Sequence, residues 1–116
     1  MNLELRRVIV FAQDLNALAA FYRDVLGLVE KLTPDDPRTW REFHAGACSI
    51  ALHNGGRSIT AGRPPKITFY VTDVPAARDE LNARGANFGR VTSVGEFQFC
   101  NGTDVEGNAL QLSSRV

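Results

Sequence analysis

Residues Arg6 to Leu28 read RRVIVFAQDLNALAAFYRDVLGL, and the fold of the chain can be predicted outward from this segment. Residues 8–12 have the β-branched and aromatic composition of a strand. Asp14 predicts a helix N-cap, because its carboxylate can accept hydrogen bonds from the first free backbone N–H groups of a helix. Gly27 predicts the helix end, since a left-handed backbone costs glycine little. The helix between them has an apolar stripe made of Leu15, Leu18, Ala19, Tyr22 and Leu26, widened by Phe21 and Val25.

The same unit recurs in the second half of the chain. Residues 66–86 read KITFYVTDVPAARDELNARGA, again a strand, a capping aspartate, a helix and a glycine. Pro75 lies in the first turn of this helix, where its missing N–H does no harm. Asp73 follows Asp14 by 59 residues, close to half of the 116-residue chain. The sequence therefore predicts two copies of one module.

The remaining segments complete a βαβββ order in each half. We expect a single domain with modules at 1–56 and 66–116, joined by a linker at 57–65. Because two helices are too few for a parallel α/β fold, the predicted class is α+β, with mostly antiparallel sheets backed by two helices. Further strands are predicted at 28–32, 39–44, 48–53, 66–72, 87–94, 96–100 and 109–113, and the second helix at 74–84.

Composition excludes several classes of protein. Thirteen basic and thirteen acidic residues balance, so no electrostatic footprint for nucleic acid or an anionic membrane is present. No apolar run reaches the roughly 18 residues of a membrane span, and no signal-peptide core is found at the N-terminus. Cytoplasmic localisation is expected, and Cys48 and Cys100 are expected as reduced thiols. Asp104 and Glu106 are expected as turn and surface residues.

Two motifs carry a family resemblance. Residues 21–28 (FYRDVLGL) after Asp14 resemble the first-helix motif of the vicinal oxygen chelate superfamily, which includes glyoxalase I, extradiol dioxygenases and the fosfomycin and bleomycin resistance proteins. Residues 104–112 (DVEGNALQL) are similar to its final turn and strand. The resemblance covers nearly the whole chain. It implies paired βαβββ modules that form a cup, commonly completed by a second chain, so a homodimer is expected.

The resemblance also implies four positions at which members of this superfamily bind a divalent metal. In this sequence they hold Arg7, Ala51, Lys66 and Gln111. Two cations and an alanine offer no lone pair, and the glutamine amide is a weak neutral donor. Shifting the register by one residue supplies no ligand either. We therefore expect no metal and no other cofactor.

Strand alternation gives the candidate ligand-binding residues and places those of the other strands on the face opposite the helices. Which face of the strand at 39–44 is inward, and so where Trp40 and Glu42 point, stays open. The candidates are Arg7, Trp40, Glu42, Lys66, Tyr70 and Gln111. In one interpretation the two cations hold an anionic or carbonyl-bearing ligand between aromatic side chains. In the other, a cation pairs with Glu42 or another carboxylate in the space where a metal would lie. Trp40 is a stacking platform or a core residue, and Tyr22 is expected to pack in the core.

The predicted function is metal-free binding of a small molecule, in the manner of the glyoxalase and bleomycin resistance type, with sequestration of a drug or metabolite in the cup. The alternative is a lyase or a dioxygenase-like enzyme of the same family with a divergent or metal-free site. His44 and His53 are the candidates for a general base in that case, because histidine changes charge near neutral pH.

Overall fold

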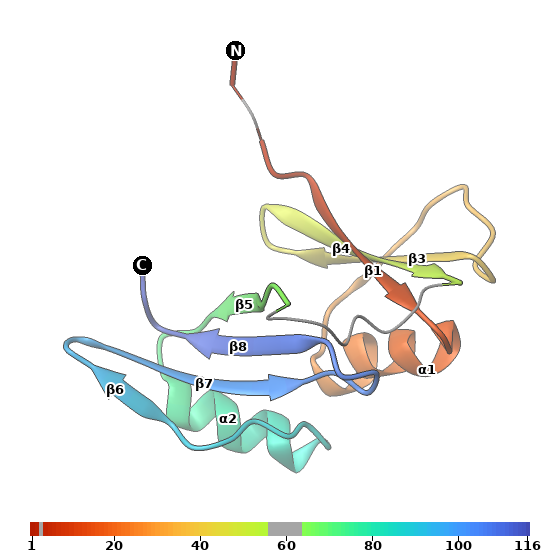
Figure 1. Ribbon diagram of the computed structural model, residues 1–116. Coiled ribbons are helices and arrows are strands. Elements are labelled where there is room, and N and C mark those ends of the chain that lie inside the picture. Colours follow the sequence, from red (N-terminus) through yellow and green to blue (C-terminus); the bar gives the residue numbers. More distant parts are fainter. Residues whose placement is uncertain (3, 56–63) are drawn as a thin grey trace. The chain divides into compact units, whose positions relative to one another are not determined.

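The computed structural model describes residues 1–2, 4–55 and 64–116 (Figure 1). The chain divides into two compact units, residues 1–58 and 59–116, which we call the first and second module. Most of the expected linker at 57–65 lies outside the described residues. Each module is described by itself.

The first module has the order βαβββ that its sequence predicts. Its described strands form one sheet in the order β1-β4-β3-β2, with β1 parallel to β4 and the other pairs antiparallel. Strand β2 is shorter than the predicted 28–32, because its pairing with β3 is confined to two residues. The elements are β1 (Arg7–Ala12), α1 (Leu15–Ala20), a π-helical turn η1 (Phe21–Val25), β2 (Glu30–Lys31), β3 (Trp40–Ala45) and β4 (Cys48–Asn54).

The second module repeats this order and topology. Its described strands form a sheet in the order β5-β8-β7-β6, with β5 parallel to β8 and the other pairs antiparallel. The predicted α+β class, with mostly antiparallel sheets and one helix per module, is confirmed for the described residues. The cup formed by two modules stays a prediction. The elements are β5 (Ile67–Tyr70), α2 (Val74–Ala83), β6 (Thr92–Val94), β7 (Phe97–Thr103) and β8 (Ala109–Ser113).

The two predicted caps have nearly identical geometry. Asp14 (φ −120°, ψ 92°) accepts a hydrogen bond from the backbone N–H of Ala17, and Asp73 (φ −123°, ψ 93°) accepts one from Ala76. Gly27 follows the first helix with φ 76°, in the left-handed region that glycine tolerates. The two halves of the sequence repeat therefore adopt the same backbone conformation at their helix N-caps.

Each helix covers one face of its own sheet. Helix α1 packs on β3 and β4, and α2 packs on β7 and β8 (Figure 1). Tyr22 is fully buried beside Phe43, with ring centroids 6.3 Å apart, as its helical position predicts. The opposite face of each sheet is not covered by the helix of its module. The buried apolar side chains include Val10, Leu15, Leu18, Phe43, Ile50 and Leu52 in the first module, and Val74, Phe88, Leu110 and Leu112 in the second.

Three predictions in the second module are wrong in detail. The strand at 87–94 begins only at Thr92, because Asn87 instead bonds Thr103 through its side chain, in two hydrogen bonds of 2.8 Å. Strand β7 continues to Thr103, beyond the predicted end at 100. Asp104 is 3% exposed rather than a surface residue, and accepts from the backbone N–H groups of Glu106 and Asn108. Its carboxylate organises the turn before β8.

The described cysteines are free thiols, and burial raises the pKa of the Cys100 thiol. Among the described helices, none is long and apolar enough to cross a membrane.

Candidate functional site

The uncovered face of the first sheet gathers most of the polar candidates, and we call it the open face of the first module. Side chains of paired residues point to the same side of a sheet, so the strand register identifies the members of this face. The register also settles that the alternating residues of β3 face the same way as Arg7. The open face of the first module consists of Arg7, Ile9, Phe11, Trp40, Glu42, His44, Ser49, Ala51 and His53.

Glu42 is the centre of this face. Its side chain is 3% exposed, and its Oε2 accepts from Arg7 Nε over 3.3 Å and lies 3.6 Å from Lys31 Nζ. Trp40 Nε1 donates to Oε1 over 3.1 Å. Buried carboxylates need such partners, since an unpaired charge away from water is costly. The ion pair that was one of the two sequence interpretations is therefore present between Arg7 and Glu42.

These donors also set the charge state of Glu42. Burial by itself would raise the pKa of the carboxyl group, because desolvation penalises the ionised form. Hydrogen bonds from Trp40, Ser49 and Arg7, together with the charge of Arg7, outweigh burial and hold this pKa below its ordinary value. Glu42 is therefore a carboxylate at neutral pH.

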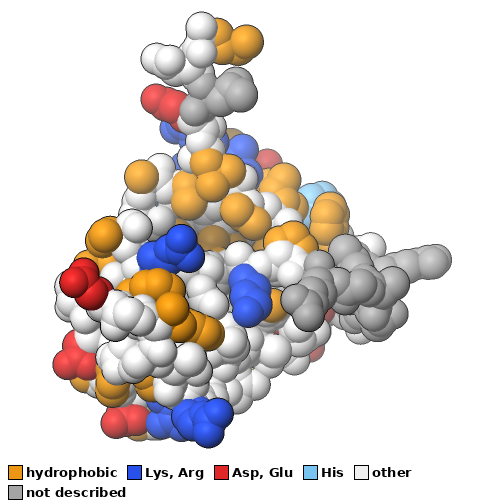
Figure 2. Space-filling view, turned by 60° about the vertical axis from the view of Figure 1, so that its left-hand side comes forward, with side chains coloured by type: hydrophobic (Ala, Val, Ile, Leu, Met, Phe, Trp, Pro, Cys, Tyr) orange, Lys and Arg blue, Asp and Glu red, His pale blue; other side chains and the backbone are white. Residues whose placement is uncertain are grey.

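Aromatic rings lie beside the ion pair. His53 lies between two of them, 5.6 Å from the Phe11 centroid and 5.8 Å from that of Trp40, the latter edge-on. The Arg7 guanidinium lies 5.8 Å from the Trp40 centroid, a cation–π contact. Phe11 remains 56% exposed and Ile9 45% exposed, so apolar surface adjoins the charged group. Figure 2 shows hydrophobic side chains at the molecular surface near Lys and Arg side chains.

His53 has a defined tautomer. Its Nδ1 lies 2.7 Å from the backbone carbonyl oxygen of Asn54, and a carbonyl can only accept, so Nδ1 carries the proton. In the neutral ring, Nε2 then has a free lone pair. His44 shares the open face but is an exposed residue. The structure thus distinguishes the two histidines that the sequence left equivalent.

The open face of the second module is polar at one end and aromatic at the other. Thr68, Gln111 and Asn101 form one row across β5, β8 and β7, and Tyr70, Ser113 and Phe99 form the next row. Lys66 directly precedes β5 and donates from Nζ to Asn101 Oδ1 over 3.1 Å. Gln111 Nε2 donates to the same oxygen over 3.1 Å, and Thr68 Oγ1 donates to Gln111 Oε1 over 3.3 Å.

The two open faces are built on equivalent positions. Arg7 donates to Glu42 and Lys66 donates to Asn101, in both cases to a residue 35 positions later. The sequence does not single out Lys31, nor Asn101, which follows the predicted end of the strand at 96–100. The repeat contained the signal for Asn101, because Glu42 plus the 59-residue offset of the caps leads to position 101.

The structure brings the predicted site residues together in two groups. Arg7, Trp40 and Glu42 are in mutual contact in the first module. Lys66 and Gln111 meet at Asn101 in the second, and Tyr70 lies in the row next to Gln111. Their roles as ligand contacts stay predictions.

The family metal positions do not fit a divalent ion. Arg7 and Lys66 are engaged cations, Ala51 has no donor atom, and the amide oxygen of Gln111 accepts from Thr68. Among the described residues, no cluster of three or more His, Cys, Asp or Glu side chains could hold a metal.

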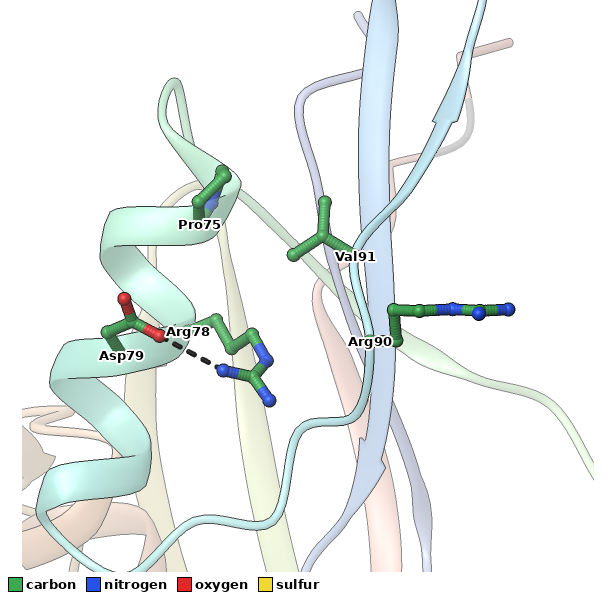
Figure 3. A pocket seen from close by; sticks show the side chains of 5 residues that line it. All are labelled: Pro75, Arg78, Asp79, Arg90 and Val91. Carbon is green, nitrogen blue, oxygen red and sulfur yellow. Dashed lines mark hydrogen bonds and ion pairs between the residues drawn. The ribbon is translucent and has the colours of Figure 1, made fainter.

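The described residues also line two surface hollows. One, of about 340 Å³, is lined by Pro75, Arg78, Asp79, Arg90 and Val91 (Figure 3). Its Arg78 is engaged, because it donates to the Gly89 carbonyl over 2.6 Å and to Asp79 over 3.0 Å. In Figure 3 the Arg90 side chain extends away from α2. The other hollow, of about 700 Å³, is lined by Glu4, Leu5, Arg6, Ala45, Ala47 and Cys48. Neither hollow brings together the residues singled out by the sequence.

Comparison with known proteins agrees with this architecture. A model of the glyoxalase-like domain matches residues 7–113. No curated protein matches the chain.

Solved structures share the fold at low sequence identity. Lactoylglutathione lyase from Agrobacterium tumefaciens superposes with a TM-score of 0.75 at 22% identity, over 95% of this chain and 92% of that one. The fosfomycin resistance protein FosX from Listeria monocytogenes, solved with Mn(II) and a dihydroxypropylphosphonic acid, gives 0.80 at 18% identity, over 100% and 93%. The oxidase ChaP-H2 gives 0.75 at 21% identity, over 100% and 96%. These neighbours have several activities, and at this identity they show the fold alone.

Proposed function

Because the chain belongs to the glyoxalase-like domain family, within the vicinal oxygen chelate superfamily, we propose that it binds a small organic molecule on its open sheet faces without a divalent metal. The observation that supports this proposal is the set of side chains around Glu42. A carboxylate that is 3% exposed, two cations, an indole N–H and exposed apolar side chains lie on the open face of the first module, which the helix of this module does not cover. Aromatic walls with a few placed polar groups are the usual composition of a small-molecule site.

The proposed ligand contacts are Arg7, Trp40, Glu42, Lys66, Tyr70 and Gln111. The donor chemistry at the four family positions supports binding without metal, because none of those side chains is a strong ligand for a divalent ion. We place the protein in the cytoplasm on the strength of its two free thiols, and its balanced charge speaks against nucleic acid as a partner.

The single tryptophan of the chain makes this proposal testable. Trp40 lies on the open face, so its fluorescence reports on occupancy there. A panel of aromatic carboxylates and ketones would be titrated into protein kept in chelator. Saturable quenching by panel members, weakened in Glu42→Gln, is the expected result. Fluorescence that no panel member changes, or that changes only after a divalent ion is added, would overturn the proposal.

A second candidate function is metal-free acid–base catalysis, which the tautomer of His53 favours. With Nδ1 donating to Asn54, the Nε2 lone pair could accept a proton from a carbon next to a carbonyl group. In D₂O the abstracted proton would be replaced by a deuteron. Deuterium uptake by acetophenone, followed by NMR, should then require the protein and be lost in His53→Gln. Uptake at the same rate in that variant would exclude this role.

A further inference from the structure

The difference between the two modules lies at positions 42 and 101. In the first module, the carboxylate of Glu42 accepts from Arg7 and Trp40 and lies beside Lys31. Its negative charge compensates the cations around it. In the second module the equivalent acceptor is the neutral amide oxygen of Asn101. The same fold position therefore supplies a carboxylate partner in one module and a neutral amide partner in the other.

The ammonium group of Lys66 has no carboxylate partner. Among the described residues, no Asp or Glu oxygen lies within 4.0 Å of its Nζ, while eight other ion pairs meet that limit. The residues outside the description, Leu3 and 56–63, include no Asp or Glu. An ammonium group carries three donors, of which Asn101 receives one.

The hydrogen bonds around Lys66 orient every amide in the cluster. Because an ammonium can only donate, Asn101 must present its Oδ1 to Lys66, and its Nδ2 group then points elsewhere. Gln111 donates from Nε2 to the same oxygen, which fixes its own amide and leaves Oε1 to accept from Thr68. The Asn101 oxygen accepts two hydrogen bonds, which uses both of its lone pairs.

Most of the hydrogen-bonding groups of this cluster that have no protein partner are donors. Lys66 and Asn101 are exposed, and two N–H groups of Lys66, the Nδ2 group of Asn101 and one N–H of Gln111 have no protein acceptor among the described residues and face solvent. An array of N–H donors beside an uncompensated positive charge is complementary to an oxyanion. Tyr70 and Phe99 lie one row further along the same face, and Tyr70 is 56% exposed. A planar apolar group attached to that oxyanion could contact them.

We propose that Lys66, Asn101 and Gln111 form an oxyanion site, and that the ligand of this protein is an aromatic molecule with a carboxylate or a similar anionic group. The inference rests on the proposed function and adds the substrate class. It assigns anion recognition to the second module and leaves Arg7 as the partner of Glu42.

Asn101→Asp is the most selective variant for this inference. The variant places a carboxylate at the position equivalent to Glu42. Lys66 is retained, but its ammonium group then has a carboxylate partner within the protein. Lys66→Met removes the charge but keeps most of the apolar stem. Arg90→Met is the matched control, since it removes one exposed cation of the same module that takes no part in the hydrogen bonds among Lys66, Asn101 and Gln111.

The measurement is a titration of each protein with benzoate and, separately, with neutral benzamide, followed through the side-chain amide NMR signals of Asn101 and Gln111. Benzoate should shift these signals saturably, and both Lys66→Met and Asn101→Asp should weaken it at least about tenfold, as expected for loss of a charge-assisted hydrogen bond. In Asn101→Asp the Gln111 signal alone is followed. Arg90→Met should bind like the unmodified protein.

Several results would overturn the inference. Equal binding of benzamide and benzoate would refute anion recognition while leaving small-molecule binding intact, as would undiminished benzoate binding in Lys66→Met. Absence of any shift with benzoate at millimolar concentration would refute the site itself, and the Trp40 titration would then decide separately whether the proposed function stands. Equal weakening in Arg90→Met would show a general charge effect rather than a site.

Discussion

Asn101 occupies in the second module the position that Glu42 occupies in the first: each accepts a hydrogen bond from a cation 35 residues earlier in the chain. One is a carboxylate surrounded by donors, and the other is an amide that cannot neutralise its lysine. The backbone repeat is therefore preserved where the chemistry of the two faces differs.

Arg7→Ala should destabilise the first module through Glu42. The carboxylate keeps Trp40, Ser49 and Lys31 but loses its closest cation, and a hydrogen bond to a charged group contributes about 1.5–3 kcal/mol. Because the Arg7 side chain is 37% exposed, the lower end of this range is expected. Urea unfolding measures the change. If Glu42→Gln in the same chain fails to recover part of the loss, the pair is not what Arg7 stabilises.

The free energy of unfolding should decrease as the pH is lowered in the acidic range, because Glu42 becomes protonated. Its pKa in the folded protein lies below the ordinary value, so its contribution is complete above roughly pH 4.3 and is lost as the pH falls further toward the folded value. Glu30, whose pKa is lowered chiefly by its hydrogen bonds to Arg41, acts in the same window. Glu42→Gln should therefore flatten part of the pH profile of urea midpoints. Glu4→Gln, which removes a carboxylate with an 82% exposed side chain, is the control and should leave the profile unchanged.

The two caps should contribute alike. Asp14→Ala and Asp73→Ala each remove a hydrogen bond to the first turn of a helix, and each should lower the unfolding free energy by about 1 kcal/mol. Asp→Asn at the same positions retains a capping oxygen and should cost less. Thermal melts compare the four variants. If only one of the two alanine variants lost stability, the two caps would share their geometry but not their contribution to the unfolding free energy.

Two chains should pair in solution. The family resemblance implies assembly with a second chain, and two-fold pairing is the commonest arrangement of identical chains. Light scattering at micromolar concentration should give twice the 12.7 kDa chain mass. A single-chain mass throughout that concentration range would contradict the expected homodimer.

Purified, untagged protein should contain no stoichiometric divalent metal. The reason is the presence of Arg7, Ala51, Lys66 and Gln111 at the four family positions, none of which is a strong ligand. Elemental analysis after dialysis provides the measurement. Zinc, nickel, manganese or iron retained at one equivalent per chain would show that another set of residues holds a metal.

Local patterns predicted much of this structure. The two caps, the βαβββ order and the alternation of β1 follow from hydrogen-bonding chemistry and period-two burial, which act within a few residues. The ion pair at Glu42 was one of two interpretations, and β3 could not be oriented until its register with β4 was known.

Asn101 could not be placed in the same way. Asn-Gly is ordinarily a turn signal, which agrees with the predicted end of the strand at residue 100. Here Asn101 and Gly102 lie inside β7. A Cβ at position 102 would come within 2.8 Å of the Asn87 side chain and 2.9 Å of the Phe88 side chain, which explains the glycine. The glycine permits close packing rather than a turn. Contacts with a segment 14 residues earlier decided the outcome, and no local pattern reports them.

We propose that the open faces bind a small molecule without metal. A chemical-shift map of chelator-treated protein titrated with benzoate tests it most directly. Saturable shifts are expected at open-face residues, including the Asn101 and Gln111 side-chain amides, with little change along α1 and α2. Shifts confined to the helices, or shifts that appear only when a divalent ion is restored, would contradict it.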